Sequence, residues 1–316
     1  MHARHVAYGL DLHASFPLAG MQTCSAEGLP SLELELLTPA ELGNAWSGPE
    51  GPPEWTGRLG DGCALTIERG VGGDVLFSYG DRARFRLEVS QRRLGCAPLR
   101  AGLHWQQVLL GRVLPNIAIM RGYEALHASA VDSPEGVVAV AGPSGMGKTT
   151  LALELLGRGW PLFADDVLTF GDGPGGVQAH PGSPHMNVAE APCSTIDPDL
   201  VGVTLGRLAG ERWLAAHTPA AQPRPVRLIC LLERGPEHSL ESQIVPPNPL
   251  PLAPYMLGLA GDAKRERRRF ERYANLMSTA SLMRLTCEST DRPADLADLI
   301  EQALAERPLL ALGDAR

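Results

Sequence analysis

Several features that would assign the chain to a familiar class of protein are scarce or missing. The 316 residues include only six cysteines and no C-x-x-C pair, which argues against a small disulfide scaffold or a zinc ribbon and favours a reducing compartment. The longest apolar runs, such as 151–156, are far shorter than the roughly 18 to 20 residues that span a bilayer. The first residues lack the charged-then-apolar layout of a secretory signal. We therefore expect a cytoplasmic protein without a membrane span.

An excess of positive charge is also missing. The chain has 28 Lys and Arg against 36 Asp and Glu, which gives a net charge of −8. Binding to a phosphate backbone needs a basic face, so the sequence predicts no nucleic-acid partner. Among the basic residues lysine is rare, and it occurs at Lys148 and Lys264 alone. Each lysine is therefore informative about its surroundings.

The apolar content of 44% and the length are sufficient for one large or two ordinary globular domains. Residues 1–102 contain short segments of alternating apolar and polar residues, such as 75–79 and 83–89, separated by Gly-rich turns. This pattern predicts a small β-rich domain, in which we identify no cluster of titratable residues. A second domain is predicted over 103–316, beginning with apolar residues at helical spacing in 108–120.

The second domain has the order of elements found in nucleotide-binding α/β units. Strands are predicted over 124–131 and 137–141, a helix over 149–156 and a short strand over 161–164. A Gly-rich loop separates the second strand from the helix, which is the arrangement of α/β folds that bind nucleotides. Further along, the sequence predicts Pro/Gly-rich loops over 171–184, 219–225 and 246–254. It also predicts a strand over 226–233 and helices over 265–277 and 293–305.

The Gly-rich loop carries the strongest chemical signal in the chain. It matches the phosphate-binding motif G-x-x-x-x-G-K-[ST] and continues by one threonine, with the residues Gly142, Pro143, Ser144, Gly145, Met146, Gly147, Lys148, Thr149 and Thr150. The motif follows a predicted strand and opens a predicted helix, as its chemistry requires. In such a loop backbone N–H groups surround the phosphates, Lys148 reaches the β- and γ-phosphate oxygens, and the Thr149 hydroxyl binds Mg²⁺.

Two adjacent acids, Asp165 and Asp166, follow the next predicted strand. A carboxylate at this position can hold Mg²⁺ from the side opposite the loop. Neighbouring side chains on a regular strand face opposite ways, so both acids can face the nucleotide only if the chain turns here. The alternative is that one of them caps a turn or helix. His127 lies on the strand before the loop's own strand, and it is either close to the phosphates or a buried structural histidine.

Three blocks together resemble the catalytic domain of the HPr kinase/phosphorylase family and its HPr-kinase-related members, which include kinases of lasso-peptide precursors. The blocks are L-H-A-S-A-V at 126–131, G-P-S-G-M-G-K-T-T at 142–150 and R-G-W-P-L-F-A-D-D-V at 158–167. The resemblance implies an α/β fold whose P-loop catalytic domain is of the phosphoenolpyruvate carboxykinase-like type. It also implies ATP-dependent transfer of phosphate to a serine hydroxyl of a peptide or small protein, and it leaves a homo-oligomer open.

The same resemblance implies a role for each site residue. His127 becomes a helper close to the phosphates, and Asp165 becomes the base toward the acceptor hydroxyl. Asp166 becomes the partner of Mg²⁺ together with Thr149, beside the catalytic Lys148. The roles of the two acids can be exchanged, because the motif does not distinguish them.

The stretch after the acidic pair departs from the family. The Gly-rich block of HPr kinases is missing there, which leaves Glu190 as an acidic counterpart and makes HPr itself an unexpected substrate. Arg212 and Arg224 are candidates for an arginine that faces the transferring phosphoryl group. The run 264–272 contains six basic side chains. It is either a grip for phosphates or an acidic peptide, or a solvated helix face.

The whole sequence predicts an ATP-dependent serine kinase that acts on a peptide or small protein, such as a lasso-peptide precursor. Two alternatives remain open. A kinase of a small hydroxylated metabolite would use the same residues with a closed acceptor pocket. A nucleotide-binding regulator would bind ATP without phosphoryl transfer. Two adjacent acids favour chemistry, because holding Mg²⁺ needs only one of them.

Overall fold

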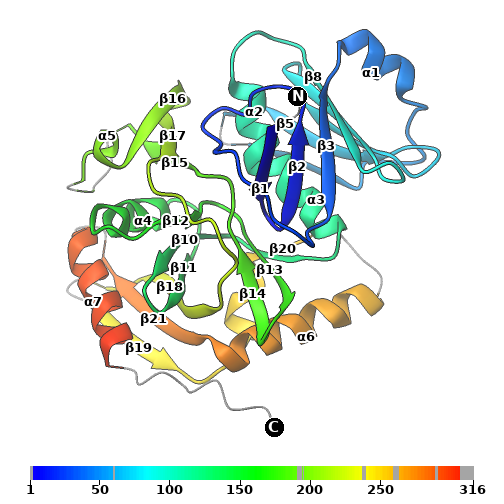
Figure 1. Cartoon of the computed structure of the whole chain (residues 1–316). Coiled ribbons are helices and arrows are strands. Elements are labelled where there is room, and N and C mark those ends of the chain that lie inside the picture. Colours follow the sequence, from blue (N-terminus) through cyan, green and yellow to red (C-terminus); the bar gives the residue numbers. More distant parts are fainter. Residues whose placement is uncertain are drawn as a thin grey trace.

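In its described residues the chain folds into four β-sheets with helices packed between and around them, a mixed α/β architecture that agrees with the predicted fold class (Figure 1). The structure is a computed structural model. It describes residues 3–59, 61–190, 194, 196–236, 240–258, 263–288 and 291–306. Within those ranges no helix is both long enough and apolar enough to cross a membrane.

The amino-terminal third of the chain forms an eight-stranded sheet with the order β1-β2-β3-β8-β7-β6-β5-β4. Its strands are β1 (Ala3–Ala7), β2 (Leu10–Ala14), β3 (Ser31–Leu36), β4 (Trp55–Arg58), β5 (Ala64–Arg69), β6 (Val75–Tyr79), β7 (Ala83–Glu88) and β8 (Arg93–Pro98), and a short helix, α1 (Pro39–Ala45), follows β3. The predicted alternation is confirmed in β7, where Ala83, Phe85 and Leu87 are buried and the residues between them are more exposed. β4 is an edge strand and pairs with β5.

A continuous helical segment follows the sheet, which confirms the helical spacing predicted over 108–120. It consists of α2 (His104–Val108), the π-helical turn η1 (Leu109–Val113) and α3 (Leu114–Met120). Its apolar side chains belong to the hydrophobic core of the amino-terminal sheet, where Leu110, Ile117 and Phe85 are fully buried. In Figure 1 these helices cross behind β1, β2 and β3. The segment therefore covers one face of that sheet.

A six-stranded sheet forms the centre of the second part, with the order β12-β10-β11-β18-β21-β19. Its strands are β10 (Ala128–Ser133), β11 (Gly136–Ala141), β12 (Leu162–Ala164), β18 (Val226–Arg234), β19 (Glu241–Val245) and β21 (Ser281–Cys287). The strands β11, β18 and β21 are parallel, and the other pairs are antiparallel. The helices α4 (Lys148–Gly157) and α7 (Pro293–Ala305) cover one face, and α6 (Ala263–Thr279) covers the other. Val138 and Ala139 therefore lie in different apolar clusters.

Two smaller sheets surround the central one. The first contains β9 (Glu124–Leu126), β13 (Leu168–Gly173), β14 (Gly176–His180) and β20 (Met256–Leu257), and the second contains β15 (His185–Ala189), β16 (Gly202–Leu208) and β17 (Glu211–Ala216). The helical turns α5 (Pro198–Val201) and η2 (Leu250–Tyr255) lie in their connections.

Two predicted elements are wrong, while the helices predicted over 149–156, 265–277 and 293–305 are confirmed as α4, α6 and α7. The strand predicted over 124–131 divides at His127 into β9 and β10, which belong to different sheets. There the His127 backbone N–H donates to the carbonyl oxygen of Tyr255, 2.7 Å away. The loop predicted over 171–184 contains most of the β13–β14 hairpin, which its Gly and Pro content conceals.

Candidate functional site

The predicted phosphate-binding loop connects β11 to α4. Gly145 and Gly147 have φ values of 77° and 97°, which other residues rarely adopt. Gly142 packs so closely on β18 that a Cβ atom there would lie 2.8 Å from the carbonyl oxygen of Leu232. No side chain caps α4, whose N-cap is Gly147. The N–H groups of the first turn of α4 are therefore suited to bind an anion.

Lys148 is the first residue of α4 and is 6% exposed. Its Nζ donates hydrogen bonds to the carbonyl oxygens of Gly142 and Pro143, at 3.1 Å each. Burial lowers the pKa of Lys148, and the charges of Asp166 and Asp165 oppose that effect. Phosphate oxygens can replace the two carbonyl oxygens as acceptors of this ammonium group.

Asp165 ends the short strand β12 and is 8% exposed. Its Oδ1 accepts from the Ser129 hydroxyl at 2.5 Å and from the Thr149 hydroxyl at 3.0 Å, and its Oδ2 accepts from the Asn187 backbone N–H at 3.1 Å. Burial and the neighbouring charge of Asp166 raise the pKa of Asp165 to about 7, although the three hydrogen bonds oppose the rise. The carboxyl group thus lies directly beside the threonine of the phosphate-binding motif.

The backbone of Asp166 has a φ of 66°, so the chain turns directly after Asp165. A left-handed backbone conformation is uncommon for a residue other than glycine and costs roughly 1 to 2 kcal/mol. The turn lets both acids contribute to one site, which a regular strand would forbid. The Asp166 carboxylate lies 3.2 Å from Nη2 of Arg112, which belongs to the π-helical turn η1.

His127 lies at the corner between β9 and β10. Its Nδ1 is 2.9 Å from the backbone carbonyl oxygen of Asp166, and because a carbonyl can only accept, Nδ1 carries the proton. Burial lowers the pKa of His127, and the charge of Lys148 adds to that effect, while the hydrogen bond to Asp166 opposes it. A neutral His127 therefore holds the backbone of Asp166 in its unusual turn.

These residues line a cavity of about 810 Å³. The phosphate-binding loop contributes Ser144, Gly145, Gly147, Lys148, Thr149 and Thr150, and Asp165, Asp166 and His127 lie beside it. Other parts of the lining come from the amino-terminal sheet and the helical segment, among them Trp55, Arg58, Asp61, Tyr79, Arg112 and Asn116. Gly142, Pro143 and Met146 belong to the loop without lining the cavity. The site is therefore shared between the two parts of the chain.

Arg112 and Asn187 are functional candidates that sequence reasoning missed. Neither belongs to a motif, and each reaches the acidic pair across a large separation in the chain. The arginines that the sequence nominates lie elsewhere, because Arg224 pairs with Asp132 at 2.9 Å and Arg212 lies 3.6 Å from Asp199. Neither of those arginines lines the cavity.

Glu190 also lies outside the cavity lining. Glu190 directly follows β15 and is exposed, and its Oε1 is 3.6 Å from Nη1 of Arg207. Its proximity to the acidic pair in the sequence therefore does not bring its carboxylate into the lining of the cavity.

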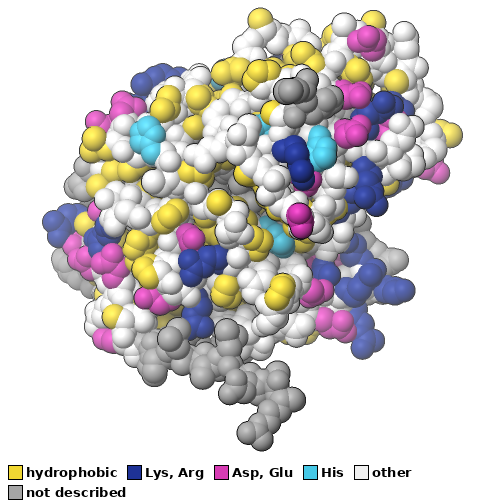
Figure 2. Space-filling view, in the orientation of Figure 1, with side chains coloured by type: hydrophobic (Ala, Val, Ile, Leu, Met, Phe, Trp, Pro, Cys, Tyr) yellow, Lys and Arg dark blue, Asp and Glu magenta, His cyan; other side chains and the backbone are white. Residues whose placement is uncertain are grey.

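The basic run on α6 is only partly solvated. Arg269 and Arg272 approach the buried carboxylate of Glu124, at 3.5 and 3.7 Å, and Arg265 donates to the carbonyl oxygen of Ile119 at 3.1 Å. Figure 2 shows Lys and Arg side chains gathered at the right of the molecule, where α6 begins in Figure 1. None of the described residues of this run lines the cavity. Its inward side chains attach α6 to the neighbouring elements.

The oxygen atoms beside the loop fit Mg²⁺ chemically. The Thr149 hydroxyl and the Asp165 carboxylate are 3.0 Å apart, and hydroxyl and carboxylate oxygens are ligands that Mg²⁺ prefers. Within the described ranges there is no group of three or more His, Cys, Asp or Glu residues that could hold a metal ion. A site of this kind needs phosphate oxygens to complete the coordination, as is usual for Mg²⁺ bound with a nucleotide.

Comparisons with known proteins give a relative by sequence and similar chains among solved structures. No protein-family model matches the chain. A segment of 110 residues is 32% identical to an HPr kinase/phosphorylase of Azoarcus sp. (strain BH72), and the match covers 35% of this chain and 32% of that protein. The chain thus spans about a third of the length of this relative. The similarity is a weak homology to an HPr kinase/phosphorylase.

A solved structure gives a more distant likeness. The Hpr(Ser) kinase/phosphatase from Coxiella burnetii matches with a TM-score of 0.31 and 13% sequence identity, over 57% of this chain and 93% of that one. A TM-score this low does not define a common fold.

Proposed function

We propose that the protein is an ATP-dependent kinase that transfers a phosphoryl group to a serine hydroxyl of a peptide or small protein. The observation that carries the proposal is the 3.0 Å hydrogen bond from Thr149 of the phosphate-binding loop to Asp165, the first residue of the acidic pair. The weak homology to an HPr kinase/phosphorylase supports the same reaction class. A lasso-type precursor peptide is one acceptor of the proposed kind.

We assign the two acids in the order that the geometry supports. Asp165, with Thr149, is the partner of Mg²⁺, because its oxygen already lies beside the threonine hydroxyl. Asp166 is the base toward the acceptor, because its carboxylate lines the cavity and pairs with Arg112 rather than with the Thr149 hydroxyl. This order exchanges the roles that the family resemblance implies. When bound, Mg²⁺ would neutralise charge on the β- and γ-phosphates.

The proposed reaction is an in-line displacement at the γ-phosphorus. The serine oxygen forms the new P–O bond and releases its proton to Asp166, while the bond from the γ-phosphorus to the bridging oxygen breaks and ADP leaves. Lys148 exchanges its carbonyl partners for phosphate oxygens and stabilises the charge on them. His127 holds Asp166 in position, and Arg112 lies where it can turn from Asp166 to the transferring group.

We also propose two domains, residues 1–102 and 103–316. The helical segment α2–α3 then belongs by sequence to the second domain but packs in the core of the first. Its position supports a closely joined pair of domains with one shared site. The lining of the cavity by residues from both parts is consistent with that arrangement.

Mass spectrometry of serine peptides after incubation with the protein, ATP and Mg²⁺ tests the function directly. We expect one phosphoryl group on serine, and we expect Lys148→Ala and Asp166→Asn each to abolish the transfer. Arg284→Ala, at an exposed strand position away from the cavity, is the control and should act like the wild type. Tight ATP binding without transfer to any peptide would support the regulator instead. Transfer to a small hydroxylated compound alone would support the metabolite kinase.

A further inference from the structure

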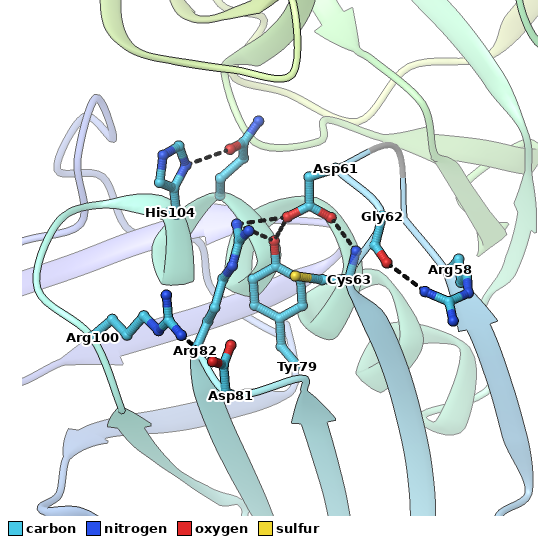
Figure 3. A network of polar contacts seen from close by, with 10 residues as sticks. Arg58, Asp61, Gly62, Cys63, Tyr79, Asp81, Arg82, Arg100 and His104 are labelled. Carbon is cyan, nitrogen blue, oxygen red and sulfur yellow. Dashed lines mark hydrogen bonds and ion pairs between the residues drawn. The ribbon is translucent and has the colours of Figure 1, made fainter.

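A polar network holds the turn between β4 and β5 at the cavity (Figure 3). The Asp61 carboxylate accepts hydrogen bonds from the Tyr79 hydroxyl, from Arg82 at 2.8 Å and from the Cys63 backbone N–H at 3.0 Å. Burial alone would raise the pKa of Asp61, but the bonds from Tyr79 and Cys63 and the charge of Arg82 lower it overall. The carboxylate is therefore ionised and fixes the turn on the sheet.

Arg58 lies at the start of this turn and lines the cavity. Its side chain donates to the carbonyl oxygen of Gly62 at 2.9 Å and has no carboxylate partner among the described residues. Arg69, at the end of β5, and Arg82, in the turn between β6 and β7, differ from it, because Arg69 pairs with Glu54 and Arg82 pairs with Asp61. Arg58, for which the described residues offer no carboxylate in ion-pair contact, thus lines the same cavity as the phosphate-binding loop.

Two further features of this wall favour an extended chain as its occupant. β4 is the edge strand of its sheet, so its outward N–H and C=O groups are available to pair with another strand. Trp55, on the same strand, is 39% exposed and also lines the cavity. Its ring lies over Gly57, where a Cβ atom would come within 2.4 Å of the indole. An aromatic surface of this kind contacts backbone and apolar side chains of a peptide.

The cavity has room for more than a triphosphate. Single ligand pockets measure about 300 to 1,000 Å³, and this cavity, at about 810 Å³, lies near the upper end of that range. The phosphate-binding loop and Lys148 supply the groups that a triphosphate needs. The wall formed by Trp55 and Arg58 supplies a separate cation and a separate apolar surface.

We propose that Trp55, Arg58 and the edge of β4 form the acceptor subsite, and that it takes a peptide with an acidic side chain close to its serine. The inference rests on the proposed kinase function and adds the class of substrate. In a chain of net charge −8, with Asp165 and Asp166 at the reacting centre, an acidic acceptor needs a local positive charge. Arg58 provides that charge where β4 lines the cavity.

The test uses the full chain and two fluorescein-labelled peptides that are identical except for two Glu or two Lys residues beside the serine. Binding is measured by anisotropy, phosphoryl transfer by mass spectrometry, and nucleotide binding with a fluorescent ATP analogue. We expect the wild type to prefer the Glu peptide by about tenfold, the magnitude of one charge-assisted hydrogen bond. Arg58→Ala should remove the preference and Arg58→Glu should reverse it. Arg84→Ala, an exposed arginine of β7 outside the cavity, is the matched control.

The outcomes separate the subsite from the kinase function. Equal use of both peptides by the wild type, or an unchanged preference in Arg58→Ala, would overturn the subsite while the kinase function stands. If Arg58→Ala lost nucleotide binding to the same extent as peptide binding, Arg58 would belong to the nucleotide site, and the proposed acceptor subsite would also be overturned. If phosphoryl transfer to free serine were as fast as transfer to the Glu peptide and depended equally on Arg58, a peptide would be excluded as the occupant of the subsite. Binding of the Glu peptide with no transfer to any serine would contradict the kinase function.

Discussion

Replacing Asp165 by asparagine should change the stability of the protein in opposite directions at low and high pH. The folded state raises the pKa of Asp165 from 3.8 to about 7, so this carboxyl opposes folding when it is ionised. Its contribution is close to zero below about pH 4, grows more unfavourable as the pH rises from about 4 to about 7, and is complete above about pH 7. At pH 8 the cost is of the order of 4 kcal/mol, since each pH unit corresponds to about 1.4 kcal/mol.

Asp165→Asn removes this cost but introduces another. The amide keeps one oxygen for the hydroxyl groups of Ser129 and Thr149, while its NH₂ group faces the Asn187 backbone N–H that now donates to Oδ2. An unsatisfied buried N–H costs about 1 to 3 kcal/mol. We therefore expect the variant to be more stable than the wild type by about 2 kcal/mol near pH 8. Near pH 4, where the ionisation cost in the wild type falls below about 1 kcal/mol, the variant should be less stable by about 1 to 2 kcal/mol.

Urea unfolding with a chelator present, at the two pH values, measures both differences. Asp298→Asn, at a side chain that is 69% exposed, is the matched control and should change stability little at either pH. Adding Mg²⁺ with an ATP analogue at pH 8 should stabilise the wild type more than Asp165→Asn, because the variant lacks the charged ligand. The same stability difference at both pH values would refute the reasoning.

Three further predictions concern residues around the acidic pair. Arg112→Ala should lower kcat by about 10²- to 10³-fold with little effect on nucleotide binding, because we propose that the guanidinium acts on the transferring group. Arg112→Lys should restore only part of the lost kcat. An unchanged kcat of Arg112→Ala in a steady-state assay would exclude that role. His127→Ala should lower kcat by about tenfold, because Asp166 loses the side chain that positions it. The pH profile of the wild-type rate should show no inflection from His127 above pH 6.5, because burial lowers the pKa of His127 below its ordinary value. An inflection above pH 6.5 that disappears in His127→Ala would contradict the neutral state of His127. Arg269→Met should destabilise the fold by about 2 to 3 kcal/mol in thermal unfolding, because Glu124 is buried beside it, while the rate per folded molecule stays the same.

The sequence predicts the loop and its helix well because their chemistry is local. Gly142 to Thr150 form one turn whose conformation depends on neighbours in the chain, and the glycines with positive φ occur where the motif requires them. Asp165 also lies close to Thr149, although β10 separates β11 from β12 in the sheet. The roles of the two acids could not be predicted, because they depend on the backbone turn at Asp166.

The rest of the site depends on contacts between distant parts of the chain. Arg112 lies in a segment whose apolar spacing indicates a core helix, and no pattern reveals that a π-helical turn directs one side chain toward Asp166. Arg58 lies in an edge strand with no motif around it. The corner at His127 is hidden for a similar reason, since the apolar residues of β9 and β10 continue the same alternation across two sheets.

The way in which α2, η1 and α3 pack has a practical consequence for dividing the protein. A fragment that begins at Gly122 would keep every recognised motif, from His127 to the acidic pair, and would look like a complete nucleotide-binding unit. It would nevertheless lose the positive charge that faces Asp166 and the wall that carries Arg58. It would also uncover the apolar surface at Ala125 and Val167 that now lies against the amino-terminal core. Transplanting the motifs onto another amino-terminal part would therefore transfer the phosphate-binding loop and the acidic pair without the residues of the proposed acceptor subsite.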